Sequence, residues 1–191
     1  MLFESYAEGF SVWVCAEDRI NRLKKKGLTP FFQHMLNDPH GLIRIETIRQ
    51  IKQAGPAVTG CTSLLRSALS DPVPAVREAA AQSLYDWGKG GYSILEALPE
   101  LITSLKDSAS VSYGAKAIQT MKSAGRSAVP VLMRLLLTDD SEQFSRIADT
   151  LISIGADAYP SVPILTLCIE HTNKDIREKA VQTRNTIMSL Q

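Results

Sequence analysis

The sequence predicts an all-α protein: an α-solenoid in which about five helical hairpins stack into a right-handed α–α superhelix behind an N-terminal cap helix. Two observations predict this class. The turns Asp38-Pro39 and Asp71-Pro72 lie 33 residues apart, and each is followed six residues later by an arginine, which indicates an internal repeat. Glycines that follow helical apolar patterns are typical of helix ends, and four recur along the chain: Gly55, Gly88, Gly125 and Gly155.

One repeat unit is expected to contain two short amphipathic helices. Residues 60–70 carry apolar side chains at helical spacing, the Asp71-Pro72 corner interrupts the pattern, and residues 74–87 carry a second apolar stripe. Aspartate can cap the helix that follows, and proline is tolerated in its first turn. Because each helix has only one apolar face, the hairpins must stack on their neighbours to bury it.

Applied to the whole chain, this template predicts a single domain over residues 1–191, with a cap helix at 1–27 and hairpins in 28–191. The expected hairpins span residues 28–54, 60–87, 94–124, 127–154 and 161–190. The connection 88–93 is longer than the others and is expected to be flexible. Tyr113-Gly114 replaces the Val-Arg pair of the template, so the third hairpin is expected to be bent or closely packed there.

The two ends of the array carry distinct patterns. Phe3, Tyr6 and Phe10 recur at three- and four-residue steps and are expected to pack as a cap over the first hairpin. Residues 183–186 place polar groups where apolar ones are expected, which predicts a C-terminal cap. Met1 fits a complete small protein as well as a part of a longer solenoid.

Composition narrows the classes of partner and compartment. The chain has 21 Lys and Arg against 20 Asp and Glu, and no segment is strongly basic, which argues against nucleic acid or a membrane as partner. Cys15, Cys61 and Cys168 are odd in number and far apart, so no disulfide framework is expected. The N-terminus lacks a secretory signal pattern, and a cytoplasmic protein is therefore predicted.

Catalytic patterns are sparse. His34, His40 and His171 belong to different hairpins and have no ligand-type residue one helical turn away, so no metal site is expected. The sequence has no phosphate-binding glycine loop, no nucleophile elbow and no cysteine with a nearby histidine. We therefore expect a protein that is not an enzyme and that carries no cofactor.

The remaining expectation is a scaffold that binds a protein partner through the second helices of its hairpins. Tyr85 is the strongest single candidate, because partly exposed aromatic residues are common hot spots. The full set of candidate partner-binding residues is Gln50, Glu78, Gln82, Tyr85, Gln119, Asp149, Ser153 and Gln182.

The repeated pattern resembles the HEAT-repeat family in its short, phycobilisome-lyase-type form. Residues 71–88 fit its pattern Asp-Pro-x-x-x-Val-Arg-x-x-Ala, followed by a glycine, in full. The first hairpin fits with Thr47 in the alanine place, the fourth fits loosely, and the fifth lacks the proline. The resemblance implies a structural ladder in which arginines reach turn carboxylates of neighbouring hairpins, formed here by Asp38, Arg44, Asp71, Arg77, Asp140, Arg146 and Arg177.

The same resemblance leaves two alternative functions open. One is a bilin lyase or another chromophore-handling protein, after the lyases that give these repeats their name. The other is a HEAT-like DNA glycosylase, for which the adjacent Asp86 and Trp87 are the candidate residues. The near-zero charge of every segment argues against the second alternative.

Overall fold

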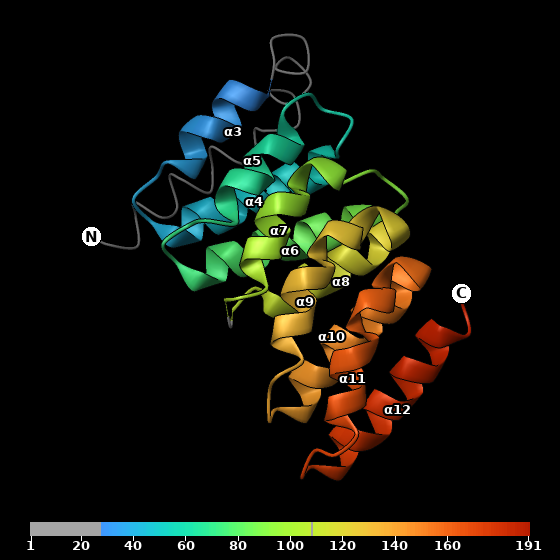
Figure 1. Cartoon of the computed structure of the whole chain (residues 1–191). Coiled ribbons are helices and arrows are strands. Elements are labelled where there is room, and N and C mark those ends of the chain that lie inside the picture. Colours follow the sequence, from blue (N-terminus) through green and yellow to red (C-terminus); the bar gives the residue numbers. More distant parts are fainter. Residues whose placement is uncertain (1–27, 108) are drawn as a thin grey trace.

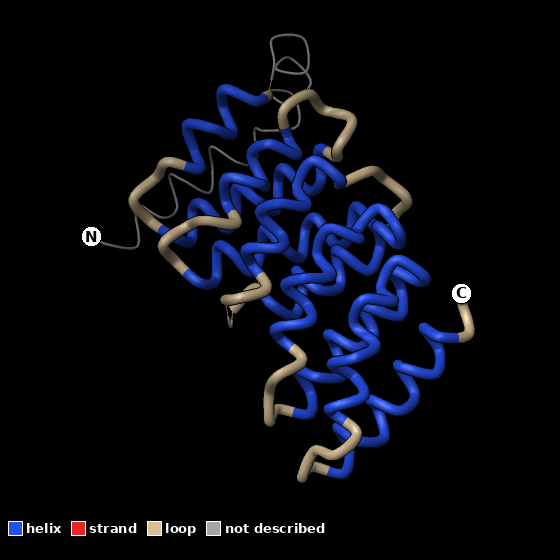
Figure 2. The backbone as a smooth tube through the Cα atoms, viewed as in Figure 1, coloured by secondary structure: helices blue, strands red, loops and turns tan. Residues whose placement is uncertain are grey.

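The computed structural model describes residues 28–107 and 109–191, and these residues fold mainly into helices joined by turns and loops (Figure 2). The predicted all-α class is therefore confirmed, and the chain is an α-solenoid. The expected cap helix at 1–27, with Cys15 and its aromatic residues, lies outside the described residues.

Helices alternate along the array, and each predicted hairpin segment holds one pair. The first helices are α3 (Thr29–Leu36), α5 (Cys61–Ala68), α7 (Leu98–Ser104), α9 (Val129–Leu135) and α11 (Val162–Cys168). The second helices are α4 (Gly41–Ala54), α6 (Pro74–Lys89), α8 (Val111–Met121), α10 (Ser141–Ile154) and α12 (Lys174–Met188). Three 3-10 segments, η1 (Leu95–Ala97), η2 (Lys122–Ala128) and η3 (Gly155–Ser161), lead into α7, α9 and α11.

The second helices form one layer of the solenoid. Each packs against the next in the order α4, α6, α8, α10 and α12, while the first helices form the other layer. Figure 1 shows the array running from α3 at one end to α12 at the other. The layers meet over one continuous apolar core that includes Leu65, Leu101, Leu132 and Leu165 from the first helices.

Equivalent positions in the second helices can be counted from their N-cap residues, which are His40, Val73, Ser110, Asp140 and Asn173. The position eight residues after the N-cap is fully or almost fully buried in the first four helices, where it holds Ile48, Ala81, Ile118 and Ala148. This common register decides which side chains of different hairpins occupy the same place.

Two of the four predicted glycine stops are helix ends. Gly55 and Gly155 are the C-caps of α4 and α10, with φ of 85° and 83°, a region in which glycine has no steric penalty. Gly88 instead lies inside α6, so the prediction of a stop there was wrong. A Cβ on Gly88 would lie 2.1 Å from Oγ1 of Thr120, and this glycine thus allows α6 and α8 to approach closely.

The second helix of the third hairpin does not end at the predicted glycine, Gly125. α8 ends at Met121, and Lys122 takes a positive φ of 51°, while Gly125 is buried within η2. A helix-ending glycine was therefore wrongly predicted at Gly125. Close packing at Gly114 is found: its Cβ would lie 2.5 Å from Oγ of Ser104 on α7.

The polar C-terminal pattern is also narrower than predicted. Thr183 is fully buried and lies ten residues after its N-cap, where α6 and α10 carry the equally buried polar residues Ser83 and Thr150. Only Arg184 replaces an apolar core residue, because the equivalent positions hold Ile51, Leu84, Met121 and Leu151.

Ser141–Cys168 is long and apolar enough by composition to cross a membrane, with a mean hydropathy of 1.4 over 18 residues. In the fold this stretch is divided among α10, η3 and α11, and the positive φ of Gly155 turns the chain between them. Phe144, Ile147 and Leu151 of α10 are fully buried in the protein core. The apolar composition of α10 is therefore used for packing between α8 and α12.

Candidate interaction surface and the arginine ladder

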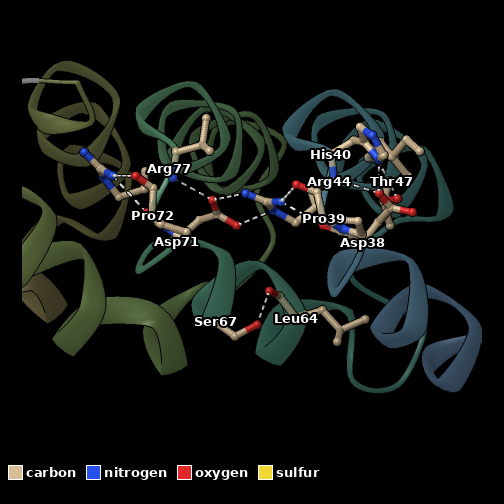
Figure 3. A network of polar contacts seen from close by, with 12 residues as sticks. Asp38, Pro39, His40, Arg44, Thr47, Leu64, Ser67, Asp71, Pro72 and Arg77 are labelled. Carbon is tan, nitrogen blue, oxygen red and sulfur yellow. Dashed lines mark hydrogen bonds and ion pairs between the residues drawn. The ribbon is translucent and has the colours of Figure 1, made fainter. Parts of the chain in front are cut away.

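An arginine of the first hairpin holds a carboxylate of the second. Asp71 accepts hydrogen bonds from Arg44 at both carboxylate oxygens, from Nε at 2.7 Å and from Nη2 at 2.7 Å. Nη1 of Arg44 also donates to the carbonyls of Asp38 and Pro39, at 2.8 and 3.2 Å (Figure 3). The side chains of Arg44 and Asp71 are only 8% and 10% exposed. This bidentate ion pair therefore joins the two hairpins at a site that is largely shielded from water.

The turn itself positions the carboxylate. Oδ1 of Asp71 accepts a hydrogen bond from the backbone N–H of Val73 at 2.8 Å, and Pro74 begins α6 at a position that needs no donor. Asp38 makes the same turn bond to the N–H of His40 at 2.8 Å. The Asp-Pro sequence therefore fixes both the corner and the direction in which the carboxylate points.

A second rung repeats the arrangement one hairpin further. Arg77 donates from Nε and Nη2 to the carboxylate of Asp107, at 2.8 and 2.9 Å, and from Nη1 to the carbonyls of Asp71 and Pro72. Asp107 was not among the predicted ladder residues. It lies 36 rather than 33 residues after Asp71, because the connection before α7 is longer, and a search at a fixed period misses it.

Both turn carboxylates have lowered pKa values. Hydrogen bonds from Arg77 hold the pKa of Asp107 well below its usual range, and a hydrogen bond from Oγ of Ser110 at 2.7 Å adds to this. For Asp71, burial raises the pKa, but the hydrogen bonds from Arg44 and from the N–H of Val73 outweigh it and the net shift is downward. Both groups therefore stabilise the folded state in their ionised form.

Asp107→Asn is expected to weaken the acid dependence of stability. Because the folded-state pKa of Asp107 lies below its unfolded value of about 4, its contribution is present above that pH and is lost as the pH falls toward the folded pKa. The variant should be less stable than the wild type at pH 7 and should lose less stability between pH 5 and pH 2.5. Urea unfolding over this range measures both, and the exposed Asp157→Asn is the control. An unchanged acid dependence in Asp107→Asn would contradict the second rung.

The ladder does not continue through the middle of the array. The position four residues after the N-cap, which holds Arg44 and Arg77, holds Gly114 in α8 and the fully buried Phe144 in α10. Close helix packing and an apolar side chain therefore replace the ion pair in these two hairpins.

Asp140 and Arg146 do not form the predicted rung. Oδ1 of Asp140 accepts from the N–H groups of Glu142 and Gln143, at 2.9 and 3.1 Å, and so caps its own helix. Arg146 donates from Nη1 to Glu142 one turn earlier, at 2.5 Å, and lies six residues after the N-cap rather than four. The loose sequence match of the fourth repeat thus took Arg146, which lies two residues beyond the ladder position, as the ladder arginine.

Arg177 occupies the ladder position of the last hairpin. Its Nη1 donates to the carbonyls of His171 and Thr172, at 2.8 and 2.7 Å, as Arg44 and Arg77 do in their own turns. No carboxylate of residues 28–107 or 109–191 lies within ion-pair distance of its guanidinium.

Four of the predicted partner-binding residues occupy equivalent places. Each lies nine residues after an N-cap, so that they form a row across the second-helix layer together with Arg49, which was not predicted. We call this set the second-helix row: Arg49, Gln82, Gln119, Asp149 and Gln182. Two members of the row contact the next second helix. Gln119 donates to Oγ1 of Thr150 on α10 at 3.1 Å, and Asp149 accepts from Nζ of Lys179 on α12 at 2.6 Å.

The other predicted residues lie off this row. Gln50 donates to Glu46 at 2.9 Å, and Ser153 donates to the carbonyl of Thr150 at 2.8 Å, so both are half-buried within their own helices. Glu78 is exposed on α6.

Tyr85 is half-buried at the contact of α6 with α8. Its ring centroid lies 6.3 Å from that of Tyr113, and Nζ of Lys116 lies 5.2 Å from the Tyr113 ring centroid. These distances are typical of aromatic and cation–π contacts. Tyr85 therefore contributes to helix packing as well as to the surface, and its neighbours Tyr113 and Lys116 were not predicted.

An open groove of about 360 Å³ lies where α10 meets α12. Gln182 of the second-helix row lines it, with Ser141, Glu142, Ser145, Asp175, Glu178 and Lys179. Each residue that lines it is polar or charged, so it suits hydrated polar contacts rather than an apolar ligand.

Comparison with known proteins finds a family that is similar to the first repeats. Residues 28–112 match the family of HEAT repeats. This match covers less than half of the 191 residues, and these residues are similar to HEAT repeats. No curated protein matches the chain.

Solved structures show the same fold beyond the matched HEAT repeats. An engineered protein is 20% identical, with a TM-score of 0.62 over 83% of this chain and 78% of its own. The complex of CpcE and CpcF of phycocyanin lyase from Nostoc sp. PCC7120 is 17% identical, with a TM-score of 0.62 over 82% and 63%. A designed armadillo repeat protein in complex with the peptide (KR)4 is 17% identical, with a TM-score of 0.62 over 89% and 86%.

The two candidate residues of the glycosylase alternative, Asp86 and Trp87, both contact Lys52 of α4. Trp87 is 5% exposed, and its Nε1 donates to the carbonyl of Lys52 on α4 at 3.1 Å. Asp86 pairs with the Lys52 side chain. Both residues therefore join α6 to α4.

The cysteines and histidines of the described residues lie at separate places in the solenoid. Cys61 and Cys168 are buried, and burial raises the pKa of the Cys61 thiol to about 11. His171 contacts Asp139 at 3.1 Å across two turns, and His40 contacts Asp38 at 3.1 Å. In the part of the chain that the structure describes, no three His, Cys, Asp or Glu residues are grouped to hold a metal ion.

Proposed function

We propose that this HEAT array is a non-enzymatic protein-interaction module that binds its partner on the second-helix layer. The observation that carries the proposal is the second-helix row, which places one polar or charged side chain from each second helix at the same register. Successive helices pack about 9–10 Å apart, so the row extends over roughly 40 Å. A surface of this length is sufficient for an interface of standard size, about 800 Å² per partner.

The two structural neighbours with partners support a protein or peptide as the ligand class. One is a complex of two chains and the other holds a peptide, and both share this fold at 17% identity. The near-neutral charge of the chain favours a partner recognised by shape and hydrogen bonding over one recognised by charge alone.

Arginine substitutions can distinguish the two layers. The double variant Gln82→Arg with Gln182→Arg adds bulk and charge to the row, and we expect it to lose a partner that the wild type retains in affinity purification from the native host. The double variant Ser63→Arg with Thr103→Arg changes exposed residues of α5 and α7 and adds the same charge to the first-helix layer. Retention of the partner by the row variant and loss by the first-helix variant would overturn the proposed surface.

A chromophore-handling role is a second proposal, and it depends on the structural likeness to the phycocyanin lyase complex. Mixing the purified chain with a bilin tests it directly. A shift in visible absorbance on binding supports this role, and an unchanged spectrum discards it.

A further inference from the structure

In α6 the residues 4 and 15 positions after the N-cap contact the next hairpin, and those at positions 8 and 11 lie between them on the same face of the helix. These four residues are Arg77, Ala81, Leu84 and Gly88, which follow one another at helical spacing along one face. Arg77 holds Asp107 of the next hairpin, and Gly88 lies against Thr120 of α8. This face of α6 therefore contacts the hairpin that follows it.

In α12 the same four positions hold Arg177, Val181, Arg184 and Met188, which we call the terminal stripe. Among the described residues α12 packs against α10, α11 and η3, and no further hairpin covers the stripe. Met188 is 51% exposed, and Val181 is half-buried although its counterparts are fully or almost fully buried. The terminal stripe thus combines two cations with two partly exposed apolar side chains.

Arg177 is already held in the conformation that binds carboxylates elsewhere in this chain. Its Nη1 makes the same two bonds to turn carbonyls that orient Arg44 and Arg77. In those two arginines Nε and Nη2 bind a carboxylate through two parallel hydrogen bonds, whereas in Arg177 they meet no acceptor of the described residues. The fork is therefore preorganised, which lowers the entropy lost on binding a carboxylate.

Arg184 adds a second cation on the same face. It takes the place that Ile51, Leu84, Met121 and Leu151 occupy in the other second helices. It lies seven residues, or about 10 Å, along the helix from Arg177. Its guanidinium donates only at 3.3–3.4 Å to the side chain of the adjacent Asn185. Charge complementarity therefore favours an acidic partner over an apolar hairpin of the kind found inside the array.

We propose that the terminal stripe docks an acidic helical hairpin of a partner protein, whose turn carboxylate binds the Arg177 fork as Asp71 binds that of Arg44. Acidic side chains further along the partner helix pair with Arg184, and its apolar side chains cover Val181 and Met188. The stripe is distinct from the second-helix row, so this contact is independent of the proposed function and can hold or fail separately.

A zero-length cross-link tests the proposal and identifies the partner residue. Arg177→Lys places an amine at the fork, and a carbodiimide then joins it to a carboxylate in direct contact. The full chain carrying this substitution is cross-linked in extract of the native host, and the linked peptides are sequenced by mass spectrometry. We expect a link from position 177 to an Asp or Glu in the turn of a helical hairpin of another protein. Arg134→Lys, at an exposed arginine of α9, is the matched control and should give no link to that protein.

The binding strength of the identified partner gives the second readout. Arg177→Ala should weaken its affinity for the full chain at least about tenfold, as expected for loss of a bidentate ion pair, while Arg134→Ala should not. A urea midpoint near that of the wild type shows that the Arg177→Ala chain is folded. Links from position 177 only to a second copy of this chain, links only to residues outside helical turns, or no link at all would each overturn the proposal.

Discussion

Arg44→Ala is expected to lower the free energy of unfolding by about 3 kcal/mol, because it leaves the carboxylate of Asp71 buried without its counter-charge. The substitution removes two hydrogen bonds to Asp71 and two to the carbonyls of Asp38 and Pro39. Of these acceptors, the Asp71 carboxylate would keep only the bond from the N–H of Val73. Urea unfolding followed by circular dichroism measures the change.

A double-mutant cycle separates the pair from its surroundings. Arg44→Ala combined with Asp71→Ala should cost clearly less than the sum of the single changes, because the buried charge that each single variant leaves is absent. Arg49→Ala removes an exposed arginine of the same helix, paired with Glu46, and should leave the urea midpoint unchanged. Equal midpoints for Arg44→Ala and wild type would show that the first rung does not stabilise the fold.

Phe144→Ala is expected to cost about 4 kcal/mol, because a fully buried aromatic ring is replaced by a cavity. Phe144 occupies the position of the ladder arginine, so this variant tests whether apolar packing takes over the stabilising role in the fourth hairpin. Thermal and urea unfolding should both report the loss. Leu167→Ala, at a leucine of α11 that is 71% exposed, is the control and should change stability by less than about 0.5 kcal/mol. Similar effects of the two substitutions would contradict the buried role of Phe144.

The ladder illustrates where sequence reasoning succeeds and where it fails. Arg44 and Asp71 were both predicted ladder residues, and the structure pairs them. The Asp-Pro turn fixes the Asp71 carboxylate through the N–H of Val73. Asp140 was placed in the ladder on the same sequence signal, yet it caps its own helix. Aspartate at a helix start serves both roles equally well, so the residue type alone does not distinguish them.

The glycines are ambiguous in the same way, because a glycine can either end a helix or allow two helices to pack closely. Gly55 and Gly155 end helices with positive φ, whereas Gly88 and Gly114 permit close packing against Thr120 and Ser104. In the sequence all four follow or interrupt apolar stripes. Which use applies depends on the distance to a neighbouring helix, and that distance is set by tertiary packing.

The sequence predicted only part of the candidate surface, because some of its contacts depend on tertiary packing. The helical period selected Gln82, Gln119, Asp149 and Gln182, which share one register on the second helices. The same period cannot show that Tyr85 stacks near Tyr113 or that Gln50 bonds to Glu46, because these contacts depend on side-chain directions across and along helices.

The sequence by itself determined the helical hairpin, its repetition and its all-α class, because amphipathic periods and Asp-Pro corners act within one repeat. Only the tertiary structure decided which arginine finds a carboxylate. Arg44 and Arg77 have one in the next turn, Gly114 and Phe144 replace the arginine, and Arg177 presents its fork at the last described hairpin. A rung joins residues 27 to 30 positions apart, so it depends on how successive hairpins are offset, and no local pattern records that offset.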